Sequence, residues 1–141
     1  MDAAPSPVST EVTTAMTPGV ARALVRIHRV GMRVVAAADR NHEDELAEAT
    51  GMFVLAFRNY RAKVDVGGER SVTLALSADQ HAALAEVKRC GNRLMDVLAD
   101  RYSRRALSIA HFELVRALDT WRKAMKSPPP VFRGANSLRF D

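Results

Sequence analysis

The segment 23-ALVRIHRVGMR-33 returns as 83-ALAEVKRCGNR-93, at an offset of 60 residues. Ala, Leu, Arg, Gly and Arg recur at matched places, and Ile27 is answered by Val87. Residues 38–40 (ADR) return as residues 99–101, and further matches follow at an offset of 61: Leu46, Ala49, Val54, Ala56 and Arg61 recur as Leu107, Ala110, Val115, Ala117 and Arg122. Self-similarity at a fixed period marks a repeated supersecondary unit. The sequence therefore predicts two copies of one helical hairpin.

The composition fits one domain or two small subdomains that share a core. The 141 residues are 48% hydrophobic and carry a net charge of +5, which favours anionic partners such as nucleic acid, nucleotides or acidic lipid. Cys90 is the only cysteine, so an internal disulfide and a cysteine-based metal site are excluded. Neither a membrane span nor the layout of a signal peptide is visible. We therefore expect a cytoplasmic protein that makes no use of a membrane.

The first helix is predicted over residues 18–40, with Thr17 as N-cap and Pro18 at the first helical position. Its apolar residues recur in steps of four and three, as on one seam of a helix: Val20, Leu24, Ile27, Gly31, Val34 and Ala38. Arginines occupy the opposite face, as a solvated surface or as a stripe that binds phosphates: Arg22, Arg26, Arg29, Arg33 and Arg40. Glycine on the seam, at Gly31 and again at Gly91, indicates close approach of another backbone or a ligand.

The second helix is predicted over residues 42–64, with Asn41 as N-cap. Its middle is apolar almost all round, and the second copy repeats this surplus of apolar side chains. The residues outside the hairpin seams are Met52, Val54 and Leu55, then Ile109, Phe112 and Val115. A helix of this kind is buried on more than one side. The other hairpin or another chain should cover these residues, and we expect a homo-oligomer.

The predicted fold class is all-α, with two tandem antiparallel helical hairpins in a four-helix arrangement. Ser77 and Gln80 form a capping box at the start of the third helix, and Ser103 caps the fourth. The third and fourth helices are predicted over residues 78–101 and 104–125. The chain then divides into a flexible, disordered arm (1–16), the first hairpin (17–64), a linker with a short extended piece at 71–76 (65–76), the second hairpin (77–126) and a tail expected to hang free (127–141).

Nothing in the sequence is typical of a catalytic site, so we expect no enzyme, no cofactor and no metal. His42 and Glu45 share a helix face, as ligands do in helical carboxylate metal sites. Their counterparts in the second copy are a serine and an alanine, so the sequence does not support a symmetric two-metal site. Glu45 and Glu48 are spaced like the paired carboxylates of all-α nucleotide pyrophosphohydrolases. The second acidic pair that binds magnesium in such enzymes is missing at that spacing.

The candidate ligand-binding residues are basic and aromatic. Tyr60-Arg61 and Trp121-Arg122 place a ring and a cation near the end of the second helix in each copy. The rings could stack on nucleobases while the arginines neutralise phosphate, or they could simply belong to the core, since both follow the apolar seam. The first helices add the remaining candidates: Arg29, Arg33, Lys88, Arg89 and Arg93.

Two short motifs carry a resemblance to a known family. Residues 84–91 read Leu-x-x-Val-Lys-Arg-x-Gly, and residues 107–118 read Leu-x-x-Ala-x-x-x-Leu-Val-x-Ala-Leu. The pattern resembles the helical hairpin of phage anti-CBASS cyclic-oligonucleotide sponges. These are small, non-enzymatic proteins that bind cyclic di- and trinucleotides, usually between the chains of a homo-oligomer. The resemblance implies that Lys88, Arg89 and Gly91, with His28, Arg29 and Gly31 in the first copy, match the family's phosphate-contacting segment.

Two functions are therefore expected. The first is sequestration of a cyclic oligonucleotide, or a similar anionic nucleotide signal, in phage counter-defence. The second is a small basic helical module that binds nucleic acid or another protein.

Overall fold

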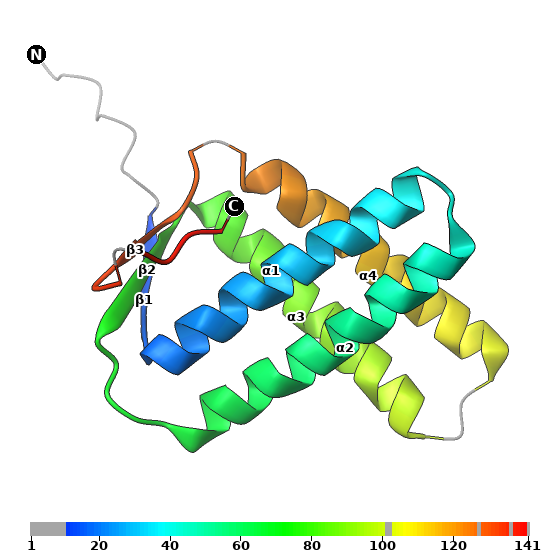
Figure 1. Ribbon diagram of the computed structural model, residues 1–141, viewed down its shortest axis with the longest axis horizontal. Helices are drawn as coiled ribbons and strands as arrows, with labels where there is room; N and C mark the ends of the chain where they lie inside the picture. Colours follow the sequence, from blue (N-terminus) through cyan, green and yellow to red (C-terminus); the bar gives the residue numbers. More distant parts are fainter. Residues whose placement is uncertain (1–10, 101–102, 127, 136, 141) are drawn as a thin grey trace, which may run out of the picture.

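The structure is a computed structural model of the chain and describes residues 11–100, 103–126, 128–135 and 137–140. Four helices and three short strands follow one another, and the prediction of a mostly helical chain built from two antiparallel hairpins is confirmed (Figure 1). The elements are β1 (Val12–Met16), α1 (Pro18–Asp39), α2 (Glu43–Val66), β2 (Val72–Leu76), α3 (Ala78–Ala99), α4 (Arg104–Ala124) and β3 (Val131–Arg133).

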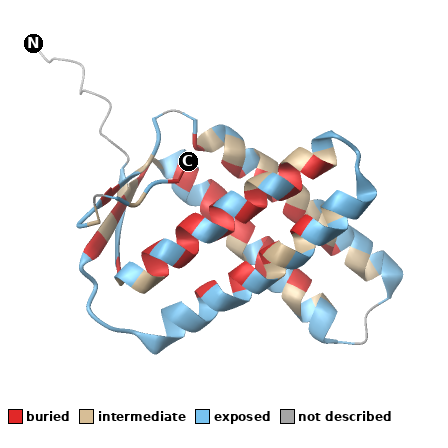
Figure 2. Ribbon diagram, viewed as in Figure 1, coloured by how far each residue is buried: buried red, intermediate tan, exposed pale blue. Residues whose placement is uncertain are grey.

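The two hairpins lie one over the other, and the small sheet closes one end of the helices (Figure 1). Within each hairpin the helices pack side by side, while α1 contacts α4 and α2 contacts α3 across the layers. The core runs along α1 and the crossing region, where buried residues concentrate (Figure 2). On β2, Val72, Leu74 and Leu76 are all buried, so every second side chain of the strand is removed from solvent.

Three predicted helix starts are confirmed. The Val20 N–H donates to the side chain of Thr17 at 3.1 Å. The Ser77 hydroxyl accepts from the Gln80 N–H at 3.1 Å, while the Gln80 side chain accepts from the Ser77 N–H at 2.8 Å. Ser103 accepts from the Ala106 N–H at 3.1 Å. Each side chain satisfies a backbone N–H that the first turn of a helix leaves without a partner.

The prediction of Asn41 as the N-cap of α2 is wrong, because this residue ends α1 instead. Asn41 has φ 57°, in the left-handed region that asparagine tolerates better than most residues. The His42 N–H donates to the Ala37 carbonyl and the Asn41 N–H to the Ala38 carbonyl, which is the Schellman pattern of a helix C-terminus. The N-cap of α2 is His42, without a side-chain cap.

The extent of the predicted N-terminal arm is also corrected, since its last residues form β1. β1 pairs antiparallel with β2, with Thr14 opposite Leu74 and Val12 opposite Leu76. Paired residues at the centre of this ladder are 60 positions apart, so each strand lies at the same place in its own repeat. The short extended piece predicted before Ser77 is confirmed as β2. Residues 1–10 of the predicted arm lie outside the described residues.

The tail does not hang free, contrary to the prediction. β3 pairs antiparallel with β2, with Phe132 opposite Leu74. Phe132 and Phe140 are both buried, and their rings stack with centroids 4.9 Å apart. Gly134 has φ 90°, and a side chain there would collide with the Ser71 carbonyl, so the turn after β3 requires glycine. The two aromatic side chains supply the apolar contact that holds the tail against the helices.

Contacts between the hairpins follow a twofold relation. Thr50 Oγ1 on α2 and His111 Nε2 on α4 form a hydrogen bond of 2.9 Å, and these two residues match at the offset of 61. A Cβ added to Gly31 would lie 2.7 Å from Leu118, and one added to Gly91 would lie 3.0 Å from Phe57. The close approach predicted at both glycines is therefore confirmed, although a side chain of the opposite hairpin makes it, rather than a backbone or a ligand.

Several apolar residues outside the seams are not covered by the opposite hairpin. Leu55 is 64% exposed, Phe112 is 62% exposed and Ile109 is 43% exposed. Met52, Val54 and Val115 are half-buried. The part of the prediction that relied on the opposite hairpin is wrong for the three exposed residues, because the hairpins cross on a different side of α2 and α4.

Candidate functional site

Each hairpin contributes a ring that is covered by a side chain from the other. The Lys88 ammonium lies 5.4 Å from the centre of the Tyr60 ring. The His28 ring lies edge-on against Trp121, with centroids 4.8 Å apart. His28 matches Lys88 at the offset of 60 residues, and Tyr60 matches Trp121 at the offset of 61 residues. The two ring pairs are therefore twofold equivalents, and a cavity lies beside each of them.

The first of these cavities, the open groove, lies beside Tyr60 and has a volume of about 250 Å³. Its basic lining residues are Lys63, Arg70, His81 and Lys88, which come from α2, the following linker and α3. Apolar side chains of α1 and α3, such as Val20 and Leu84, form part of the remaining wall, and residues of β1 and β2, such as Met16 and Leu74, also line it. Among the described residues that line it there is no carboxylate, so the groove is electropositive.

The second cavity, the tail cavity, has a volume of about 810 Å³ and lies between the tail and the helices. His28, Met32, Arg122 and Met125 line it from the helices. Met125 occupies the position that Val64 occupies in the open groove, so the two cavities share a common plan. The tail makes the difference, because Phe140 covers His28 here with ring centroids 5.3 Å apart.

Arg122 lies in the tail cavity, but its charge is already balanced. It donates to Asp39 at the end of α1 at 3.1 Å and to Asp119 one turn earlier at 2.6 Å. Hydrogen bonding from Lys123, followed by the charges of Lys123 and Arg122, holds the pKa of Asp119 below its usual value. Arg122 therefore ties α4 to the end of α1 and is a weaker candidate for binding an anion than an unpaired cation.

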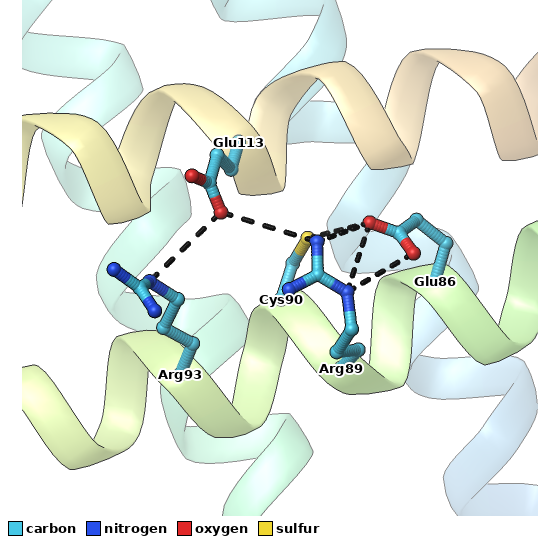
Figure 3. Close-up of polar contacts among 5 residues, drawn as sticks. All are labelled: Glu86, Arg89, Cys90, Arg93 and Glu113. Atoms are coloured by element: carbon cyan, nitrogen blue, oxygen red, sulfur yellow. Dashed lines mark hydrogen bonds and ion pairs between the residues drawn. The ribbon is translucent and has the colours of Figure 1, made fainter.

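Arg89 and Arg93 lie in a mixed-charge cluster on α3 and α4 (Figure 3). Arg89 forms an ion pair with Glu86 on its own helix, and the Glu113 carboxylate on α4 lies 4.0 Å from Arg89 and 3.9 Å from Arg93. The hydrogen bond from Arg89 lowers the pKa of Glu86. Burial and the adjacent Glu86 raise the pKa of Cys90 to about 11, so its thiol stays protonated at neutral pH. Glu86 and Glu113 therefore offset the positive charges of Arg89 and Arg93, which the sequence analysis proposed for phosphate binding.

Arg29 and Arg33 lie elsewhere, on the exposed face of α1. Together with Arg22 and Arg26 they form the arginine stripe, and in the part of the chain that the structure describes none of the four makes an ion pair or a side-chain hydrogen bond. Arg61 is exposed and donates to the sulfur of Met95 at 3.6 Å. These residues line neither the open groove nor the tail cavity.

The nine residues predicted to bind a ligand thus do not converge on one site. Tyr60 and Lys88 meet in the open groove, and Arg122 lines the tail cavity. Trp121 is fully buried beneath the tail cavity, so the alternative in which this ring belongs to the core is the one the structure favours.

The other basic residues of the open groove, Lys63, Arg70 and His81, are not among the residues predicted from the sequence. Lys63 follows Tyr60 by one helical turn, and this spacing was a usable signal. His81 lies two turns before Lys88 on the same face of α3, so its spacing was a signal as well. Arg70 gave none, because it lies in the linker between α2 and β2 and no helical spacing relates it to the other lining residues.

Within the described residues, no group of three or more His, Cys, Asp or Glu side chains is arranged to hold a metal ion. None of the described helices combines the length and hydropathy required to cross a membrane. The chain matches no protein-family model, and no curated protein and no solved structure matches it.

Proposed function

We propose that this chain is a non-enzymatic protein that sequesters an anionic nucleotide, of the cyclic di- or trinucleotide class, and that the open groove is its binding site. The observation that supports the proposal best is the lining of this groove: two lysines, an arginine and a histidine beside one tyrosine, with no carboxylate among the described lining residues. In phage counter-defence, as in the sponges that the sequence resembles, such binding would lower the concentration of the free signal.

Lys88 is the residue best placed to receive a phosphate. Its ammonium lies over the Tyr60 ring, and this cation–π contact holds it at the groove before any ligand arrives. A positioned cation loses less side-chain entropy on binding than a free lysine does. Lys63 lies one turn beyond Tyr60 on α2, and the apolar wall formed by Leu24 and Leu84 offers a surface for a nucleobase.

The size of the groove indicates that two chains would each bind part of one ligand. Its volume of about 250 Å³ is below the ~300–1,000 Å³ of pockets that enclose a drug-sized ligand. One nucleotide unit fits such a space, whereas a whole cyclic oligonucleotide extends beyond it. A second chain that contributes a second open groove would enclose the rest of the ligand, as in the homo-oligomers of the family that the sequence resembles.

The proposal is tested by calorimetric titration of cyclic di- and trinucleotides into the full chain. We expect saturable binding by the wild type and a loss of about tenfold or more in affinity for Lys88→Met. A charge-assisted hydrogen bond contributes ~1.5–3 kcal/mol, and each 1.4 kcal/mol is tenfold in affinity. Lys63→Met should act in the same direction.

Arg58→Met is the matched control, because Arg58 is an exposed cation on α2 that does not line the groove. Its affinity should equal that of the wild type. If no cyclic nucleotide produces a heat of binding, or if Arg58→Met and Lys88→Met lose affinity equally, binding in the open groove is contradicted.

A second candidate function, binding of nucleic acid, is supported by the arginine stripe. Arg22, Arg26, Arg29 and Arg33 recur at helical spacing along α1, and arginines without ion pairs are suited to phosphates that lie along a strand. Titration of a random DNA duplex at two salt concentrations separates this function from the first. Duplex binding that weakens steeply with salt, and that each Arg→Gln change in the stripe weakens further, would favour the second candidate.

A further inference from the structure

The tail cavity differs in chemistry from its twofold equivalent. The open groove has Lys88 above its ring, whereas the tail cavity has His28. β1 lines the open groove, whereas the tail lines the tail cavity. Apart from its basic groups, the lining consists of large apolar side chains and prolines, notably Met32, Met125, Phe132 and Phe140. An occupant of this cavity therefore needs a larger apolar part than a nucleobase.

Among the described residues, the charged side chains that line the tail cavity are all basic. Arg122, Lys126 and Arg139 line it together with His28, and the described lining residues include no carboxylate. Arg122 is paired with Asp39 and Asp119, which lie outside the cavity. Lys126 and Arg139 are exposed and make no ion pair with any residue that the structure describes, so their charges remain available to a ligand.

We propose that the tail cavity is a second ligand site, specific for an amphipathic organic anion. Its apolar body would pack among Met32, Met125 and Phe140, and its single negative head group would lie against Lys126 and Arg139. The volume of about 810 Å³ falls within the ~300–1,000 Å³ typical of small-molecule sites. This site is separate from the open groove, and its ligand is independent of the nucleotide proposed there.

The natural reporter of this site is Trp121, the only tryptophan of the chain. Its ring lies 4.8 Å from His28 and 6.4 Å from Phe140, and both of these residues line the cavity. The probe is 8-anilinonaphthalene-1-sulfonate, which combines an apolar aromatic body with one negative charge. We expect saturable binding of one probe molecule per chain, with energy transfer from Trp121 to the bound probe.

Charge dependence distinguishes the site from nonspecific apolar binding. The double variant Lys126→Gln, Arg139→Gln should bind the sulfonate about tenfold more weakly, as the loss of charge-assisted contacts predicts. The same variant should bind N-phenyl-1-naphthylamine, a probe of similar shape without the sulfonate, as the wild type does. Lys126→Arg, Arg139→Lys keeps both charges and should restore sulfonate binding. Lys63→Gln, in the open groove, is the matched control and should leave both probes unaffected.

Displacement of the bound sulfonate probe by other anions shows which chemical class of anion the site prefers. Dodecanoate, with an aliphatic body, should displace the sulfonate, whereas a cyclic dinucleotide should not. The near-ultraviolet circular dichroism of Trp121 should stay native in every variant, which excludes binding to partly unfolded chains. Absence of saturable binding, equal affinities in the double variant and the wild type, or a loss caused by Lys63→Gln would overturn the assignment. None of these outcomes depends on whether nucleotides bind the open groove.

Discussion

Gly31 and Gly51 both lie inside helices, yet their surroundings are opposite. The side chain of Leu118, on α4, lies 2.7 Å from the place where a Gly31 Cβ would stand, and Leu118 is fully buried. Nothing lies within 4 Å of a Cβ at Gly51. Replacing glycine by alanine gains ~1 kcal/mol of helix propensity at an open position, whereas added volume in a packed core costs ~1–3 kcal/mol.

We predict that Gly31→Ala lowers the free energy of unfolding by about 1 kcal/mol, because overpacking against Leu118 outweighs the gain in helix propensity. Gly51→Ala, the matched control on α2, should raise it by about 1 kcal/mol. Urea unfolding of the two variants and the wild type measures both values. Equal stabilisation by the two substitutions would show that α1 and α4 do not approach as closely as the structure has them.

At the scale of elements, α2 and α4 meet through the hydrogen bond between Thr50 and His111. Burial lowers the pKa of His111 from its ordinary value of 6.5. The unfolded chain therefore binds a proton at this residue more readily than the folded chain does. The resulting stability is present above about pH 6.5 and is lost as the pH falls through the lower pKa of the folded state.

We accordingly predict that the free energy of unfolding falls less on acidification in His111→Gln than in the wild type. The glutamine keeps a polar partner for Thr50. The measurement is the free energy of unfolding in urea near pH 7.5 and near pH 5.5 for both proteins. The wild type should lose more stability between these values than the variant does. His81→Gln, an exposed histidine on α3 that makes no ion pair with any residue the structure describes, serves as the control and should behave like the wild type. Parallel losses in all three proteins would contradict a role for His111.

The elements differ in how far the sequence predicts them. The four helices follow from apolar spacing and from caps such as Thr17 and Ser77, since both signals are local. β1 was missed because five residues of Val, Thr, Ala and Met next to a polar stretch carry little signal alone. Comparison of residues 12–16 with 72–76 at the offset of 60 would have revealed it, because Val, Thr and Ala recur there.

The candidate site was predictable only in part, for a different reason. Lys88 and Tyr60 could be proposed from their residue types and their repeated positions. That Glu113 would offset the charge of Arg93 depends on how α4 lies against α3, which no spacing along the chain encodes. The docking of Phe140 likewise depends on the edge of β2, which lies far from it in the sequence.

At the scale of the whole molecule, exposed apolar side chains remain on α2 and α4. Leu55 and Phe112 are each more than 60% exposed, and Ile109 is exposed as well. Large apolar side chains that are exposed on neighbouring turns or helices are common at protein–protein contacts. A second copy of the chain is the partner that also fits the shared binding proposed for the open groove.

We predict that the wild type is a dimer or a larger oligomer at micromolar concentration, and that Leu55→Glu, Phe112→Glu converts it to a monomer. A buried charge without a partner disfavours an interface strongly. Light scattering after size-exclusion chromatography measures the mass of each protein. Val66→Glu, at the exposed end of α2, is the control and should leave the mass unchanged. A monomeric wild type would contradict the prediction.

The bond between Thr50 and His111 also shows what covalent linkage of the two hairpins permits. In a symmetric dimer of identical hairpins, every residue on the axis faces a copy of itself, so two different side chains cannot meet there. One continuous chain is free of that constraint, and here a hydroxyl faces an imidazole. The same freedom lets Lys88 and His28 differ at equivalent positions, so the two ends of one repeated architecture present different chemistry.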